Sequence, residues 1–162
     1  MAKLIVIGIG QQMRGDDAAG VQVVQKWASE YPERLSGSQV EMALTPLPGL
    51  GLLDQLSGYD GAILVDAVLG GPGVSPGALL HLTPKDLAGF SRGAGSAHGW
   101  GVAESFQLAE VMGLVEIPDW IKILGIGGGQ VQLGARLSPE VADAIPQAAA
   151  ALDRLVEDWL NR

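Results

Sequence analysis

Cysteine is absent from the 162-residue chain, and histidine occurs only twice, as His81 and His98. The lack of cysteine excludes disulfides, thiolate metal ligands and cysteine nucleophiles. No apolar run approaches the roughly 18 residues that span a bilayer, and the first residues do not form the pattern of a signal peptide. We therefore expect a cytoplasmic protein without membrane insertion.

Positive charge is also scarce. Ten Lys and Arg residues against 18 Asp and Glu residues give a formal net charge of −8. Because no basic cluster offsets this charge, non-specific binding to nucleic acid or to anionic lipid is disfavoured. Hydrophobic residues make up 48% of the chain and charged residues 17%, which argues against disorder. The length fits a single domain over residues 1–162.

Apolar and β-branched runs predict strands at residues 3–7, 39–44, 62–66, 78–83 and 120–126. Helical patterns separate most of them, and a final helical pattern begins at Ser138-Pro139, with Pro146 expected to kink or divide it. This alternation is typical of an α/β domain with a doubly wound sheet. Residues 67–77 show no helical pattern, so we expect strand 78–83 to run antiparallel at an edge.

Candidate functional residues follow the predicted strands at the edge where doubly wound sheets carry their sites. Asp16 and Asp17 come after the first strand, Asp66 ends the third, and His98 lies in a loop of small residues. An Asp pair by itself is typical of a helix cap. A charge at the end of a buried strand, however, is costly unless it is paired or metal-bound. Two carboxylates and one imidazole suit a divalent ion such as Zn²⁺ or Ni²⁺.

Two other α/β classes remain alternatives, both of them non-catalytic metal- or partner-binding modules. A nucleotide-binding module is suggested by Gly8 and Gly10, but the third glycine of that fingerprint is displaced to Gly15. A receiver-like module would need a lysine at the end of the last strand, whereas Lys122 lies near its start. His81 alternates with leucines in the predicted edge strand, so we assign it no catalytic role.

Several short motifs together carry a family resemblance over nearly the whole chain. They are, in order, LIVIGIG at 4–10, RGDDAAGV at 14–21, LVDA at 64–67, SAHG at 96–99, ILGI at 123–126 and GARLSPEV at 134–141. In this combination they resemble the nickel–iron hydrogenase maturation endopeptidases. The resemblance implies a single three-layer α/β/α domain with a twisted, five-stranded, mostly parallel sheet.

The resemblance also implies an activity, which is removal of the C-terminal extension from a hydrogenase large-subunit precursor after nickel insertion. Matching motif to motif places the metal ligands at Asp17, Asp66 and His98, with Asp16 as the flanking acid. We take all four as candidate catalytic residues. The implied cofactor is nickel presented by the precursor, or another divalent ion such as zinc in the isolated protein.

Two loops are expected to form the groove for the extended tail of that precursor. They are residues 45–51, which contain Gly49, and residues 93–99, which contain Gly95. Because the chain has no cysteine and few other ligands for a closed site, we expect weak intrinsic nickel affinity that the precursor's own ligands complete.

Overall fold

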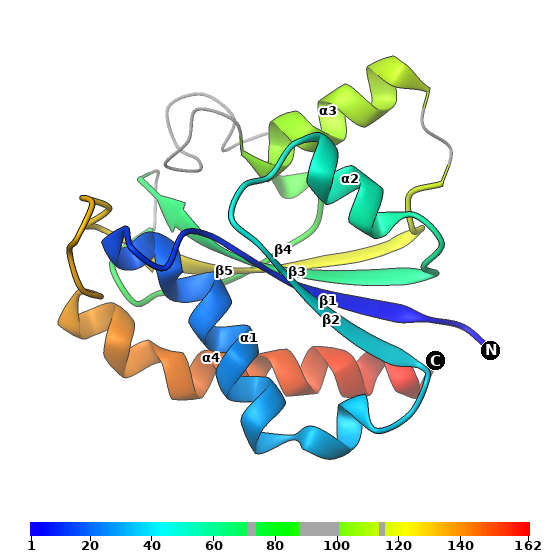
Figure 1. The fold of residues 1–162 in the computed structure, drawn as a ribbon, viewed down its shortest axis with the longest axis horizontal. Helices are drawn as coiled ribbons and strands as arrows, with labels where there is room; N and C mark the ends of the chain where they lie inside the picture. The colour runs from blue at the N-terminus through cyan, green and yellow to red at the C-terminus, as the bar shows by residue number, and fades with distance from the viewer. Residues whose placement is uncertain (71–73, 88–100, 114–115) are drawn as a thin grey trace.

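The computed structural model describes residues 1–70, 74–87, 101–113 and 116–162. Within these ranges, strands form one sheet in the order β2-β1-β3-β5-β4 (Figure 1). The strands are β1 (Leu4–Ile9), β2 (Val40–Thr45), β3 (Gly61–Leu69), β4 (Leu79–Leu82) and β5 (Trp120–Gly128). All neighbours pair in parallel except β4, which runs antiparallel to β5 at the edge. The predicted sheet and its antiparallel edge strand are confirmed.

Helices cover both faces of this sheet, which confirms the three-layer architecture (Figure 1). One face carries α1 (Ala19–Glu30) and α4 (Pro139–Leu160), and the other carries α2 (Leu50–Leu56) and α3 (Val102–Met112). Short 3₁₀ helices, η1 (Gly15–Ala18) and η2 (Pro32–Leu35), flank α1. The helix α4 continues through Pro146 over 22 residues, so the proline does not divide it. None of the helices in the described ranges combines the length and the apolar character needed to cross a bilayer.

The central strands are apolar on both faces because each face is packed under helices. Leu4 and Val6 of β1 belong to the core beneath α1 and α4. Ile5 and Ile7 alternate with them and belong to the core beneath α2 and α3. The sheet thus separates two hydrophobic cores, and β1 and β3 lie in the middle of both.

The strand β3 is longer than the sequence pattern predicts. Its pairing with β5 runs from Gly61 opposite Trp120 to Leu69 opposite Gly128. The expectation that this strand ends at Asp66 is therefore wrong, because the ladder with β5 supports three further residues. The pairing with β1, in contrast, stops at Val65. Asp66 is thus the first residue of β3 beyond the β1 ladder.

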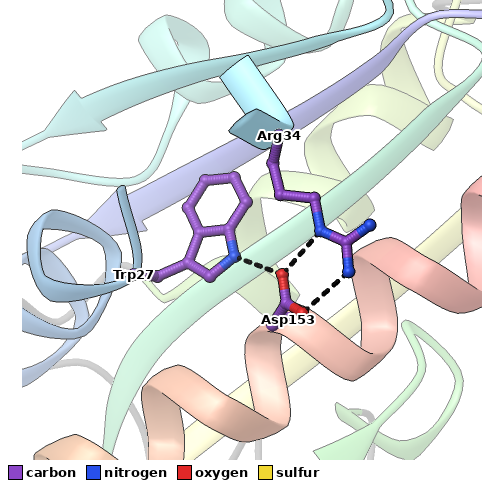
Figure 2. A network of polar contacts seen from close by, with 3 residues as sticks. All are labelled: Trp27, Arg34 and Asp153. Carbon is purple, nitrogen blue, oxygen red and sulfur yellow. Dashed lines mark hydrogen bonds and ion pairs between the residues drawn. The ribbon is translucent and has the colours of Figure 1, made fainter. Parts of the chain in front are cut away.

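An ion pair joins Asp153 of α4 to the partly buried Arg34 of η2, and a hydrogen bond joins Asp153 to Trp27 in the C-terminal half of α1 (Figure 2). Arg34 donates through Nε to Asp153 Oδ1 and through Nη2 to Oδ2, each at 2.9 Å, and Trp27 Nε1 donates to Oδ1 at 3.1 Å. Burial raises the pKa of Asp153, but the hydrogen bonds from Arg34 and Trp27 outweigh it and hold that pKa below its ordinary value. The carboxylate form of Asp153 therefore stabilises the packing of these helices.

We predict that Asp153→Asn lowers the free energy of unfolding by about 2–4 kcal/mol at neutral pH, because it breaks a largely buried charged pair. The lowered pKa makes the wild-type contribution complete above about pH 4 and removes it as the pH falls through the folded-state value. Urea unfolding at several pH values should show the difference from wild type shrinking in acid. Asp158→Asn, at an exposed position of the same helix, is the control and should change little. Equal losses for the two variants would contradict the assigned role.

Candidate active site

The start of α1 lies close against the sheet and brings the turn η1 to the carboxyl end of β1 and to the point in β3 where its pairing with β1 stops. A Cβ atom at Gly20 would lie 2.3 Å from the carbonyl oxygen of Val65 and 2.7 Å from that of Ile9. Only glycine permits this approach. The contact explains the glycine in the AAGV motif, and it fixes where η1, with Asp16 and Asp17, meets β3.

The side chain of Asp17 is buried, with 3% of its surface exposed. Its Oδ2 accepts a hydrogen bond from the backbone N–H of Gln11 at 2.8 Å. The turn between them needs glycine at position 10, where φ is 141° and a Cβ would lie 1.8 Å from the Asp17 carbonyl oxygen. The loop after β1 therefore sets the orientation of Asp17.

Asp66 is also buried, with 7% of its surface exposed. Strand alternation places its side chain on the same face as Ala62 and Leu64, towards α2 and α3. Burial raises the pKa of Asp66 well above its ordinary value, the negative charge of Asp17 raises it further, and the backbone N–H of Ala67 lowers it. The fold thus brings two of the predicted site residues, Asp17 and Asp66, together in a place where their charges repel.

Asp16 has different surroundings, although it is the adjacent residue and is fully buried. Its Oδ2 accepts from the backbone N–H groups of Gly129 and Gln130 at 2.8 Å and from the Ser138 hydroxyl at 2.6 Å. Its Oδ1 accepts from the Ser138 N–H at 2.6 Å. Burial raises the pKa of Asp16, but these hydrogen bonds outweigh it and lower that pKa. Neither η1 nor α1 has a side-chain cap bond, so Asp16 caps neither helix.

The predicted final helix begins at Ser138, but the hydroxyl of this serine is not used by that helix. It stands at the N-cap position of α4, and it makes no side-chain hydrogen bond to that helix. The hydroxyl donates to Asp16, 122 residues away in the sequence. A helix-start pattern is local and therefore carries no signal for such a distant partner.

Gly49 lies at the start of α2, and its N–H donates to the buried Ser105 hydroxyl at 2.7 Å. That hydroxyl donates in turn to the Gly101 carbonyl oxygen at 3.0 Å, which joins the loop before α2 to the start of α3. Sequence reasoning did not single out Ser105, because a small polar residue in an amphipathic helix gives no signal. His98 and Gly95 lie outside the described residues. His81 is exposed on β4, as its alternation with leucines predicts.

A hollow of about 320 Å³ opens at the carboxyl edge beside β1 and β2. It is lined by residues 10–13, Val21, Leu44, Thr45 and Pro46. Thr45 and Pro46 belong to the loop 45–51 that was expected to border the substrate. Gln11 lines the hollow and also donates its N–H to Asp17.

Within the described ranges, no group of three His, Cys, Asp or Glu side chains is arranged to hold a metal ion. Those ranges supply two adjacent buried carboxylates, Asp17 and Asp66. Oxygen donors that repel each other in a buried place fit a divalent cation, because the cation removes the repulsion.

Comparison with known proteins assigns the chain to a family. The HycI family model, which describes hydrogenase maturation proteases, matches residues 45–154. The chain belongs to the hydrogenase maturation protease family. This membership gives it a peptidase role in hydrogenase maturation and confirms the resemblance found in the motifs. No curated protein matches the chain.

Solved structures of such proteases share the fold. The hydrogenase maturating endopeptidase HybD from E. coli is 23% identical, with a TM-score of 0.77 over 96% of this chain and 93% of that chain. HybD from Thermococcus kodakarensis, a [NiFe] hydrogenase maturation protease, is 22% identical, with a TM-score of 0.69 over 95% and 99%. An endopeptidase from Escherichia coli is 24% identical, with a TM-score of 0.75 over 93% and 89%.

The buried carboxylate pair predicts that a site substitution stabilises the metal-free protein. In the presence of a chelator, Asp66→Asn should raise the free energy of unfolding at neutral pH by on the order of 1 kcal/mol, because one of two repelling charges is removed. Thermal unfolding measures the change, and the exposed Asp119→Asn controls for net charge. Millimolar zinc should then stabilise the wild type more than the variant. A less stable Asp66→Asn protein would show that the two carboxylates do not repel each other.

Proposed function

We propose that this protease is a cytoplasmic endopeptidase that removes the C-terminal extension of a nickel-loaded hydrogenase large-subunit precursor. The observation that carries the proposal is the pair of buried carboxylates, Asp17 and Asp66, at the carboxyl edge of the sheet in a member of this family. In this proposal the nickel is part of the substrate, and the chain recognises a precursor that already holds it.

Asp17 and Asp66 would hold a divalent cation through oxygen, and His98 would add a nitrogen ligand. A cation held there, whether nickel from the precursor or zinc in the isolated protein, would supply Lewis acidity at the scissile carbonyl. A carboxylate of the site would take the proton of the attacking water and pass it to the departing amine nitrogen as the C–N bond breaks. Asp16, Asp17 and Asp66 are the carboxylates available for this step.

The tail of the precursor lies along the carboxyl edge, where the hollow beside Thr45 and Pro46 is open to it. Gly49 precedes α2 on one side of this path. The part of Gly95 in the groove stays a prediction from the sequence. The proposal needs an extended substrate, because only an extended chain reaches both a buried carboxylate pair and its neighbouring hollow.

The test is incubation of the purified protein with nickel-loaded and nickel-free large-subunit precursor, followed by intact-mass spectrometry. We expect shortening of the loaded precursor only. His98→Ala should reduce the rate at least 100-fold, because it removes the nitrogen ligand. His81→Ala, the matched control, should cleave at the wild-type rate, since His81 is exposed on β4.

Two outcomes would contradict the proposal. A precursor whose mass is unchanged in both nickel states would remove the peptidase activity and leave a non-catalytic binding module. Wild-type cleavage by His98→Ala would remove His98 from the site.

A further inference from the structure

Asp16 is the point at which three elements of the carboxyl edge meet. Asp16 belongs to η1. Its donors are the N–H groups of Gly129 and Gln130, which follow β5, and the N–H and hydroxyl of Ser138, which directly precedes α4. All four hydrogen-bond partners are donors, and the residue has no exposed surface. Both carboxylate oxygens are therefore engaged by groups of the protein, and neither is exposed to an attacking water.

Further hydrogen bonds join the segment that contains Asp16, residues 13–16, to the segment that contains its donors, residues 129–138. Three connect backbone to backbone, and one comes from an arginine side chain. They are Asp16 N to Gln130 O at 2.6 Å, Gly134 N to Met13 O at 2.7 Å, Gly15 N to Ala135 O at 3.1 Å and Arg14 Nε to Val131 O at 3.3 Å. Asp16 thus belongs to a contact of several hydrogen bonds between the loop after β1 and the loop after β5.

Asp17 follows Asp16 directly in η1, so any shift of this turn moves Asp17 relative to Asp66. We infer that Asp16 is a positioning residue, which holds η1 against residues 129–138 and thereby fixes Asp17 beside Asp66, and that it is not the base that takes the proton of the attacking water. The inference rests on the proposed function for its catalytic readout, and on the hydrogen-bond geometry alone for its metal-binding readout.

Asparagine tests this role because it keeps the shape of aspartate and offers an acceptor at one position only. In Asp16→Asn the amide nitrogen must face either the Ser138 N–H or the three donors at Oδ2. At least one donor is left without an acceptor, so η1 shifts or loosens. Ser138→Ala is a milder variant, since it removes one donor and leaves the carboxylate in place.

Asp153→Asn is the matched control. Asp153 is likewise a buried carboxylate held by several donors, so the substitution also costs stability. It lies 15 residues after Ser138 on α4, roughly 22 Å along the helix. Asp153→Asn should therefore lower the stability of the protein without displacing Asp17, which separates the two effects.

The experiment measures the zinc affinity of each folded variant by calorimetry, and kcat and KM for the nickel-loaded precursor across pH. Asp16→Asn should lower zinc affinity and kcat by about 10- to 100-fold, the usual effect of removing a residue that orients a metal ligand. The acidic limb of its pH profile should remain, because the base is still present. Ser138→Ala should lower zinc affinity and kcat by a smaller factor than Asp16→Asn does. Asp153→Asn should leave zinc affinity and kcat at their wild-type values.

Three results would overturn the inference. One is loss of the acidic limb with unchanged zinc affinity, which would make Asp16 the base. Another is an equal loss of zinc affinity in Asp153→Asn, which would reduce the role to general stability. The third is unchanged zinc affinity and kcat in both Asp16→Asn and Ser138→Ala. A wild-type protein that does not cleave would refute the proposed function, while the zinc affinities of the variants would still decide the positioning role.

Discussion

The burial of two neighbouring carboxylates, Asp17 and Asp66, is the constraint around which the carboxyl edge of this protein is built. Each has less than a tenth of its surface exposed, and the charge of one raises the pKa of the other. Such an arrangement costs free energy in the unliganded protein and persists only where the surrounding structure enforces it. It therefore indicates a place prepared for positive charge.

Close contacts around the pair supply that enforcement. Gly20 lets the start of α1 reach the backbone of β1 and β3, and Gly10 lets the loop after β1 fold back on Asp17. The two cores on either side of the sheet hold β1 and β3 in register beneath these contacts. The stability of the apolar interior thus offsets the electrostatic cost at the edge.

Three buried aspartates in this chain show how surroundings decide what a carboxylate can do. Asp153 meets a guanidinium and an indole N–H, so its charge stabilises the packing of helices. Asp16 meets four donors from two distant segments, so its charge holds loops together. Asp66 lies near the charge of Asp17, so its own charge destabilises the site unless a cation offsets it. Residue type alone distinguishes none of these roles.

The sequence predicted the features that depend on local pattern. Continuous apolar runs located the strands, and the lack of a helical pattern in residues 67–77 predicted the antiparallel edge strand. Asp66 stood out because a charge in an apolar strand is unusual. The three further residues of β3 were missed because pairing with β5 extends the strand. The partners of Asp16 and the bridge made by Ser105 were missed because they join residues far apart in the chain. His98 and Gly95 lie outside the described residues, so their roles stay predictions.

The central claim is that Asp17 and Asp66 together hold a divalent cation at the carboxyl edge. A crystal of the protein soaked in millimolar zinc and measured at the zinc absorption edge tests it most directly. We predict one dominant anomalous peak within about 2.0–2.2 Å of a carboxylate oxygen from each of the two residues, with a nitrogen of His98 completing the ligand set. A dominant peak elsewhere, with both carboxylates free of metal, would contradict the claim.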